Sequence, residues 1–496
     1  MNSLTRPFIP RTGPALFGLL MITACDRGFD SMNVSPNAPT TVTADYLLPH
    51  GIYSAVDVYW GGSGVRTGST VGFGQDVGNC FAQHWARIQY TSTDQYDISN
   101  EITDNTWRDF YTESLADFER VRQLSQDGNE PNYQAISLIM RSWVFSLLTD
   151  TYGDIPYTSA LNGLDNGLSP QYDTQKDVYR GIIAELKSAS EMIVIGSKPV
   201  SGDILYGGNM ARWQKFANSL SLRLLNRQLG RADAAIDVKA EIERILADPA
   251  KYPVFTANAD NASLVYLGSA PNNNPVNHNR ITSNRDDHRV SKTLVDKLQA
   301  LSDARLAIYA DKPTAGGDYV GVPNGLNPSD ANSLGLAKTS KVGTYFTAAT
   351  APGVIITYAE LQLIKAEMAY RGVAAAGGAA TNYTNGIRAS FAQYGLTAGA
   401  DYLDKVAYAG GAQGYRQILE QKWIALFGQG VEAWTEQRRT GIPALVVPAT
   451  NYNNGVIPTR LPYPSSEESL NKVNFAEALT RQGSVNDKTF KLWWAQ

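Results

Sequence analysis

The stretch from Tyr133 to Ala160 constrains the fold of this chain more than any other. Its first part carries apolar residues at helical spacing, and a helix this apolar is expected to be buried on most sides. These residues are Ile136, Ile139, Met140, Trp143, Val144, Phe145, Leu147 and Leu148. Because Gly153 can take a left-handed cap and Pro156 keeps Ile155 out of the helical region, the sequence predicts an abrupt end to this helix.

The turn that follows this helix carries Tyr152, Asp154 and Tyr157. We expect Asp154 to accept hydrogen bonds from backbone amides, and the tyrosines to pack with their hydroxyl groups satisfied. A catalytic Asp154 is the alternative. The structural role is the preferred interpretation of this turn.

The bulk composition is that of an ordinary globular protein. The 496 residues are 43% hydrophobic and 18% charged, with a formal net charge of −4. Mild acidity without a run of Lys or Arg argues against a nucleic-acid partner. After the N-terminus, no apolar run approaches the roughly 20 residues that would span a bilayer.

Residues 1–24 have the layout of a secretory signal peptide, in which Arg6 and Arg11 precede an apolar stretch. The segment ITAC at residues 22–25 resembles the bacterial lipobox, whose cysteine becomes the lipidated first residue of the mature chain. We therefore expect Cys25 to carry a lipid anchor. A plain signal peptide cleaved just before Cys25 is the alternative.

The chain has two cysteines, Cys25 and Cys80. If Cys25 carries lipid, Cys80 lacks a disulfide partner and is expected to be a small buried hydrophobe. Residues 25–43 are polar and rich in Asn, Pro and Thr, which predicts a tether after the lipidated cysteine. Residues 44–496 are then expected to form a single domain.

Further helices are predicted on both sides of the central one. Apolar residues at helical spacing mark residues 44–58, 102–121, 178–193, 213–224, 234–247, 358–368, 387–391 and 415–427. Thr174 is expected to cap one helix, and Gly441 to end another ahead of Pro443. Three long segments are rich in Gly or Asn: residues 60–80, 257–290 and 311–350. The first completes no phosphate-binding pattern, so we expect a mobile surface loop there.

The sequence carries no local motif for catalysis or metal binding. It contains no H-E-x-x-H, G-x-S-x-G or C-x-x-C pattern. The histidines, His50, His84, His278 and His288, are widely separated. Asp286 and Asp287 form an adjacent acidic pair in a loop-rich segment, and we expect Arg285 or Arg289 to cap them. A structural calcium ion bound by acids and carbonyl groups of the loops is an open alternative, and no other cofactor is predicted.

Several segments in chain order carry a family resemblance. They are NVSPNAPT at residues 33–40, TDTYGDIPYTSAL at 149–161, DILYGGNMARWQKFANSLSLRL at 203–224, YAELQLIKAE at 358–367 and QKWIALFGQGVEAWTEQRRTGIP at 421–443. Together they resemble the SusD/RagB family of outer-membrane lipoproteins, which capture nutrients for a TonB-dependent transporter.

The resemblance implies an all-α fold, with tetratricopeptide-like helix pairs in a superhelical scaffold and a loop-rich ligand-binding lobe. It also implies a non-enzymatic protein that binds an oligosaccharide, or less favourably a peptide. Such a protein would be the lid of a SusC-like TonB-dependent transporter. It would be lipid-anchored in the outer membrane and face the cell exterior.

Ligand contacts in the family come from loop regions that correspond to residues 60–96 and 265–330. Sugar rings stack on Trp and Tyr, while Asn, Asp and Arg bind hydroxyl groups. The candidate ligand-binding residues are Trp60, Trp85, Tyr90, Tyr96, Tyr266, Asn274, Arg285, Asp286 and Tyr319. The sequence predicts neither catalytic residues nor metal ligands.

Two alternative functions stay open. A lipid-anchored glycan hydrolase is one, because two acids far apart in sequence can meet in space. A helical-repeat scaffold without a small ligand is the other. Turnover of an oligosaccharide would favour the hydrolase, and binding to a barrel without any glycan or peptide would favour the scaffold.

Overall fold

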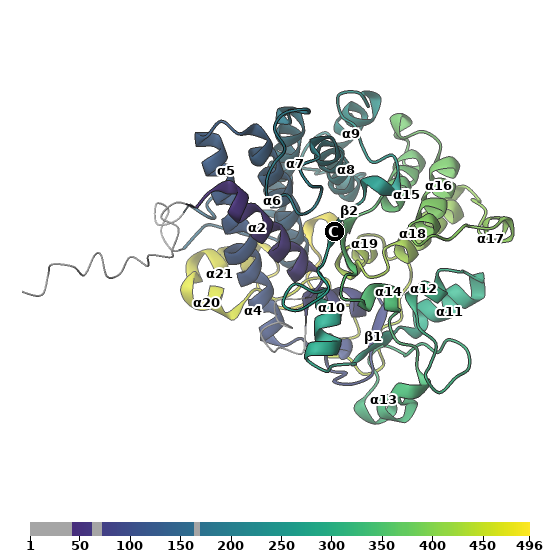
Figure 1. Ribbon diagram of the computed structural model, residues 1–496. Coiled ribbons are helices and arrows are strands. Elements are labelled where there is room, and N and C mark those ends of the chain that lie inside the picture. Colours follow the sequence, from purple (N-terminus) through teal and green to yellow (C-terminus); the bar gives the residue numbers. More distant parts are fainter. Residues whose placement is uncertain (1–41, 62–71, 163–168) are drawn as a thin grey trace, which may run out of the picture. The chain divides into compact units, whose positions relative to one another are not determined.

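Helices dominate the described residues of this computed structural model, which are 42–61, 72–162 and 169–496 (Figure 1). The residues from Ala44 to Gln496 form one unit. The predicted signal peptide, Cys25 and nearly all of the tether lie outside the described residues. The prediction of an all-α fold is confirmed, with two small pairs of strands added to it.

The helices fall into three groups along the chain. The first group is α2 (Ala44–Tyr59), η1 (Phe73–Asn79), η2 (Thr93–Gln95), α4 (Asn100–Asp109), η3 (Phe110–Leu115), α5 (Ala116–Asp127), α6 (Pro131–Tyr152), α7 (Gln175–Met192), α8 (Met210–Gln228) and α9 (Val238–Ala247). The second is η4 (Asn258–Asp260), α10 (Pro275–Asn277), η5 (His278–Thr282), α11 (Lys292–Leu301), α12 (Leu306–Tyr309), α13 (Pro328–Leu334), η6 (Leu336–Lys338) and α14 (Thr344–Thr347). The third is α15 (Tyr358–Tyr370), η7 (Ala374–Ala376), α16 (Ala379–Ala392), α17 (Ala400–Lys405), α18 (Gly411–Ala425), α19 (Gly430–Thr440), α20 (Ser465–Leu470), α21 (Lys472–Arg481) and η8 (Trp493–Ala495).

Consecutive long helices pack as neighbours. Helix α6 contacts both α5 and α7, α7 contacts α8, and α15 contacts α16 (Figure 1). The second group is different, because its helices are short and loops separate them. The chain thus has a scaffold of helix pairs and a lobe rich in loops, as predicted.

The central helix α6 is buried along most of its length, as its apolar sequence predicts. Gly153 ends it with a φ of +94°, although its ψ of −120° lies outside the left-handed helical cap that we expected. Any other residue would be strained at this positive φ, and its Cβ would displace the amide end of Gln482, which lies 2.5 Å away.

The turn after α6 has the predicted structural role. Asp154 accepts hydrogen bonds from the backbone N–H of Gln175 at 2.9 Å and from Arg481 Nε at 2.5 Å. The hydroxyl of Tyr152 donates to Thr103 O at 2.9 Å, and that of Tyr157 to Glu185 Oε1 at 2.7 Å. The turn therefore ties the end of α6 to α7 and α21.

The predicted helix caps at Thr174 and Gly441 are confirmed. Thr174 Oγ1 accepts from the backbone N–H of Asp177 at 3.2 Å, and α7 begins at the next residue. Gly441 ends α19 in the left-handed conformation, with φ of +69° and ψ of +11°. Helix α9 begins only at Val238, four residues after the predicted start, because Asp237 is its cap.

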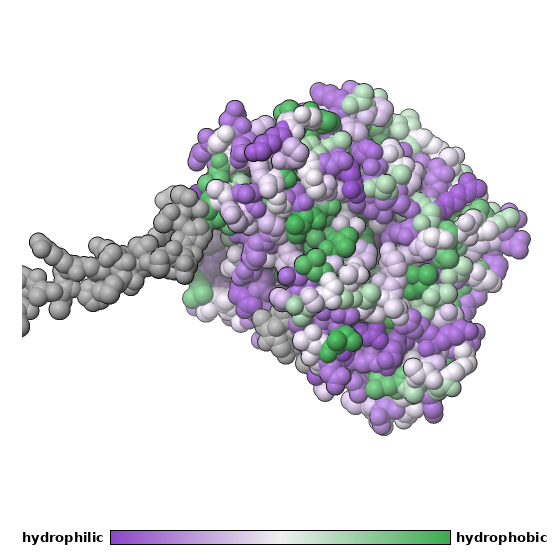
Figure 2. Space-filling model, in the orientation of Figure 1, coloured by the Kyte–Doolittle hydropathy of each residue, from purple (hydrophilic) through white to green (hydrophobic). Residues whose placement is uncertain are grey.

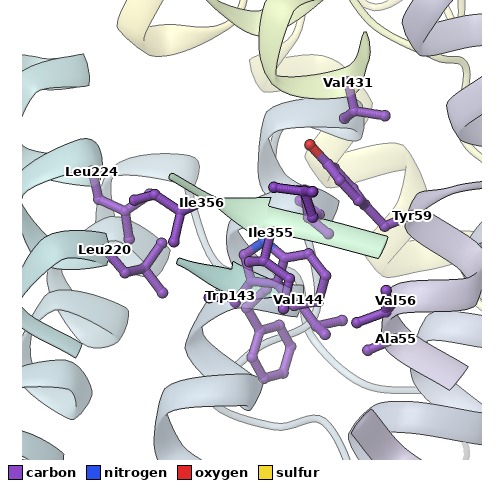
Figure 3. Close-up of a cluster of buried hydrophobic side chains, with 14 of the residues drawn as sticks. Ala55, Val56, Tyr59, Trp143, Val144, Leu220, Leu224, Ile355, Ile356 and Val431 are labelled. Atoms are coloured by element: carbon purple, nitrogen blue, oxygen red, sulfur yellow. The ribbon is translucent and has the colours of Figure 1, made fainter. Parts of the chain in front are cut away.

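A short antiparallel pair of strands lies in the middle of the helices. Strand β2 (Ala262–Val265) pairs with β4 (Pro352–Ile356). Figure 3 shows Ile355 and Ile356 of β4 among Val56 and Tyr59 of α2, Trp143 of α6, Leu220 and Leu224 of α8 and Val431 of α19. The main core thus joins elements from all three thirds of the chain.

The Gly-rich segment 60–80 is only partly a loop. Residues 62–71 lie outside the described part, but Phe73–Asn79 form the buried helix η1, so a surface loop is the wrong prediction there. Glycines on both sides, Gly78 of η1 and Gly430 of α19, permit close backbone contact. A Cβ atom at Gly78 would lie 2.5 Å from the backbone nitrogen of Val431, and one at Gly430 would lie 2.1 Å from that of Asn79. Glycine is needed because η1 and α19 touch backbone to backbone.

Buried ion pairs connect the long helices. Arg223 of α8 pairs with Glu360 of α15, and Arg227 of α8 pairs with Asp150 of α6 and Glu432 of α19. A second group joins Arg439 of α19 and Lys422 of α18 to Glu367 of α15 and Glu436 of α19. Charges as deeply buried as these are stable only when they are paired and hydrogen-bonded.

Candidate functional site

The loop-rich lobe is organised by a second pair of strands. Strand β1 (Trp85–Arg87) pairs antiparallel with β3 (His288–Val290), so that Trp85 lies opposite Val290 and Arg87 opposite His288. This pairing brings the candidate segment around Tyr90 next to the candidate segment around Arg285. Three predicted ligand residues, Tyr90, Arg285 and Asp286, therefore lie in one small region.

Tyr90 and Arg285 form a stacked pair at the surface. Tyr90 is 62% exposed, and its backbone takes a φ of +52°. The guanidinium carbon of Arg285 lies 4.3 Å from the centre of the Tyr90 ring, which is cation–π geometry. Arg285 Nε also donates to Asp287 Oδ2 at 3.0 Å. The arginine is thus held in place, and the tyrosine presents a broad aromatic surface to solvent.

Asp286 is surrounded by three cations. Its carboxylate lies 2.7 Å from Lys341 Nζ, 3.2 Å from Arg289 Nη1 and 3.4 Å from Arg280 Nη2. Burial alone would raise the pKa of Asp286, but the hydrogen bond from Lys341 and the nearby arginines outweigh it and lower that pKa. The prediction that Arg285 or Arg289 caps the acidic pair is confirmed.

Asp76, Cys80 and His288 bring three potential metal ligands within 4.8 Å of one another. The donor set does not fit a cation. The buried Arg87 guanidinium pairs with the Asp76 carboxylate, so its charge would repel a metal ion. Burial raises the pKa of the Cys80 thiol well above its ordinary value, which disfavours the thiolate. His288 Nε2 lies 2.8 Å from Asp76 Oδ1, and this pair braces η1 against β3.

A cavity of about 10 Å³ in this region is lined in part by Arg285 and Trp85. Four atoms of its lining residues are buried and have no hydrogen-bond partner in the described part of the chain: Gln75 Nε2, Trp85 Nε1, Asn279 Oδ1 and Arg285 Nη2. A space of this size accommodates about one water molecule, so a sugar ring cannot enter. Trp85 therefore lies beyond the reach of a ligand in this conformation.

A larger groove of about 380 Å³ opens on the same lobe. Its walls are residues 323–327, the start of α11 and residues 446–450. The polar residues that line it are Gln83, Lys292, Thr293, Asp296, Asn324, Asn327, Asp330 and Thr450. The combination of amide, hydroxyl and charged groups suits a ligand with many hydroxyl groups.

Asp94 holds one wall of this groove in position. It accepts hydrogen bonds from Asn324 Nδ2 at 2.7 Å and from the backbone N–H of Gly325 at 3.0 Å. Burial raises the pKa of Asp94 to about 6, although these hydrogen bonds oppose the rise. The sequence predicts that residues 311–350 are a loop region, but it does not indicate that residues 446–450 form the facing wall of this groove. No local pattern shows that the two segments meet.

The other candidate residues lie away from solvent or apart from this region. Trp60, Tyr96, Tyr266 and Asn274 are buried, and Tyr319 is half-buried. Trp60 Nε1 donates to Val354 O at 3.2 Å, and Asn274 caps α10 by accepting from the backbone N–H of Val276 at 2.8 Å. Tyr319 faces Lys312, whose Nζ lies 5.3 Å from its ring centre.

Hydrophobic residues form only separate patches on the face shown in Figure 2, and the largest lies near the position of β2 in Figure 1. Val265 and Leu267, at the end of β2 and just beyond it, are 66% and 60% exposed. Within the described part of the chain, no helix combines the length and apolar character needed to cross a membrane.

Comparison with known proteins supplies a family and a set of similar folds. A family of SusD-like proteins, described as starch-binding and associating with the outer membrane, matches residues 36–464. A solved chitin-binding protein is 28% identical, with a TM-score of 0.77, and the match covers 92% of this chain and 100% of that one. A SusD homologue from Bacteroides fragilis NCTC 9343 is 26% identical, with a TM-score of 0.75 and the same coverage. One from Bacteroides ovatus ATCC 8483 is 25% identical, with a TM-score of 0.78, over 91% of this chain and 99% of that one. No curated protein sequence matches the chain.

Proposed function

This chain belongs to the SusD-like family, which is described as starch-binding and associating with the outer membrane, and we propose that it captures an oligosaccharide at the cell surface for import. The observation that carries the proposal is the family match over residues 36–464. The similarity to a chitin-binding protein at 28% identity makes oligosaccharides of N-acetylglucosamine the first ligands to test.

The geometry of the lobe supports glycan binding. The exposed ring of Tyr90 offers a flat surface for the apolar face of a sugar, and Arg285 stacked on its other side keeps that ring in place. The groove between residues 323–327 and 446–450 supplies polar groups for sugar hydroxyls and amides. In this proposal Tyr90, Arg285 and Asp286 belong to the binding surface, and the buried candidates do not.

The partner in this proposal is a SusC-like TonB-dependent transporter in the outer membrane. The chain would be the lid of that barrel, open to admit the oligosaccharide and closed while the transporter imports it. Cys25 would carry the lipid anchor and residues 26–43 would form the tether, with the protein on the outer side of the membrane. The energy for import would come from the transporter.

SusD-like proteins are binding proteins, and the proposal assigns no reaction to this chain. It therefore predicts that purified full-length protein binds chitin oligosaccharides in calorimetry and leaves them intact over a day at 25 °C. Release of shorter sugars would instead support the glycan hydrolase. Absence of binding to glycans and peptides alike would support the scaffold.

The partnership has its own test. Tagged protein is purified from gently solubilised native membranes, and the chains that accompany it are identified by mass spectrometry. A TonB-dependent barrel in equal amount supports the lid. If the intact, lipidated protein is recovered without a barrel, the transport role is excluded even when the glycan is bound.

A further inference from the structure

A second groove of about 380 Å³ lies on the helical scaffold, between α9, residues 249–256 and α15. Its walls are largely apolar. They come from Ile245, Leu246, Pro249, Val254 and Phe255. The residues that line it belong to the scaffold and include none of those that line the groove in the loop-rich lobe.

Three polar side chains of α15 line this groove. Tyr358, Gln362 and Lys365 are spaced four and three residues apart, so they form one stripe on the helix. Glu360 and Glu367, which take part in the buried ion pairs, lie on the opposite side of α15 at about 100° per residue. One face of the helix thus stabilises the core, and the other faces the groove.

None of these three polar groups has a hydrogen-bond or ion-pair partner among the described residues. Gln362 is only 6% exposed, yet its amide forms no hydrogen bond among the described residues, and the same holds for the Tyr358 hydroxyl. The half-buried Lys365 amine forms neither a hydrogen bond nor an ion pair there. Burial lowers the pKa of Lys365, and no neighbouring acid offsets that effect. The nearby Asp260 is already bound to Lys215 at 2.9 Å.

We propose that this groove binds the carboxylate of an apolar acid, with the apolar part against Leu246 and Val254 and the carboxylate on Lys365 and Gln362. A carboxylate would provide the missing negative charge and accept a hydrogen bond from each side chain. A neutral sugar would supply hydroxyl groups but leave the lysine charge uncompensated. This site is separate from the proposed glycan surface and does not depend on it.

The test uses full-length protein and 3-phenylpropionate, with 3-phenylpropionamide as a neutral probe of nearly the same shape. Binding is followed by ligand-observed NMR and calorimetry. We expect the acid to bind and the amide to bind at least tenfold more weakly. A peptide that ends in phenylalanine, compared with the same peptide amidated at its C-terminus, then separates a peptide end from a free acid as the source of the carboxylate.

The variants are Lys365→Met and, as a matched control, Lys239→Met on the exposed side of α9. Lys365→Met should weaken binding of the acid at least tenfold and leave the melting temperature nearly unchanged, because the half-buried amine makes no hydrogen bond or ion pair with the described residues. Lys239→Met should change neither. The proposal is overturned if neither carboxylate binds at 10 mM, if the amide binds as well as the acid, or if a folded Lys365→Met variant binds like the unmodified protein.

Discussion

Arg223 donates from Nε and Nη2 to both carboxylate oxygens of Glu360, at 2.7 and 2.6 Å, and both side chains are buried. Arg223 lies in the segment DILYGGNMARWQKFANSLSLRL, and Glu360 in YAELQLIKAE. The segments that carry the family resemblance thus meet in the core. Their charged residues stabilise the helix stack, and the proposed glycan surface is built from other residues.

This pairing predicts a large stability loss for Arg223→Met. The change leaves the Glu360 carboxylate buried without its main partner, which costs about 3–5 kcal/mol in comparable pairs. The free energy of unfolding is measured in urea at pH 7. Lys292→Met, which breaks an exposed pair with Asp296, should change it by no more than about 0.5 kcal/mol. Equal effects of the two changes would contradict the importance of the buried pair.

The lowered pKa of Glu367 predicts how the stability of the fold depends on pH. Burial would raise its pKa, but Arg439 and Lys422 outweigh burial and lower it to about 2, from an ordinary value of 4.5. The folded protein favours the ionised carboxylate. The contribution of Glu367 to the free energy of unfolding is therefore fully present above pH 4.5 and is lost as the pH falls towards 2. The drop in pKa from 4.5 to about 2 corresponds to about 3 kcal/mol of stability, because each pKa unit is worth about 1.4 kcal/mol.

The measurement is the free energy of unfolding between pH 2 and 7 for the unmodified protein and Glu367→Gln. The variant should be much less stable at pH 7, and the difference should shrink as the pH falls. Two curves that stay parallel down to pH 2 would rule out a strongly lowered pKa at Glu367.

Tyr90→Ala should weaken oligosaccharide binding about tenfold, since the loss of a stacking surface costs roughly 1–2 kcal/mol. Stability should change little because the ring is 62% exposed. Tyr46→Ala is the control, as Tyr46 is 75% exposed on α2. Calorimetry with the same oligosaccharide gives both affinities. Unchanged affinity in Tyr90→Ala would show that the Tyr90–Arg285 pair is not part of the binding surface.

Gly430→Ala should destabilise the fold by about 1–3 kcal/mol, the usual cost of overpacking. The new Cβ would lie 2.1 Å from the backbone nitrogen of Asn79, so η1 and α19 would have to separate. Gly268→Ala, where a Cβ meets nothing within 4 Å, is the matched control. Thermal unfolding of the two variants compares them directly, and similar melting temperatures would contradict the close contact.

Cys25→Ser should release the protein from the membrane fraction if Cys25 carries the lipid. Cell fractionation with detection by an antibody measures this distribution. Cys80→Ser should stay with the membrane, because Cys80 is buried in the folded unit. Retention of the Cys25→Ser protein in the membrane would show that another attachment holds it there.

Much of the fold could be predicted from local patterns. The apolar spacing in residues 133–148 gave α6, and Thr174 and Gly441 gave two helix ends correctly. Residues 73–79 were missed because glycines usually mark loops. Here Gly78 allows backbone contact with Val431, which is distant in sequence.

The candidate site was less predictable. Tyr90 and Tyr96 occupy one polar, aromatic segment, yet Tyr90 is 62% exposed and Tyr96 is 2% exposed. Tyr96 packs against Phe81, with ring centres 5.3 Å apart, whereas the Tyr90 ring stacks on the Arg285 guanidinium at the surface. No periodicity within residues 85–96 distinguishes the two rings.

The sequence by itself determined the helix pattern, the caps, the family and the residue types available for binding. These depend on neighbours within a few positions, or on segments that can be compared one at a time. The tertiary structure alone decided which aromatic rings face solvent, which charges pair in the core and that residues 323–327 meet residues 446–450. Exposure and pairing are set by contacts between residues up to hundreds of positions apart, and only the folded chain brings those residues together.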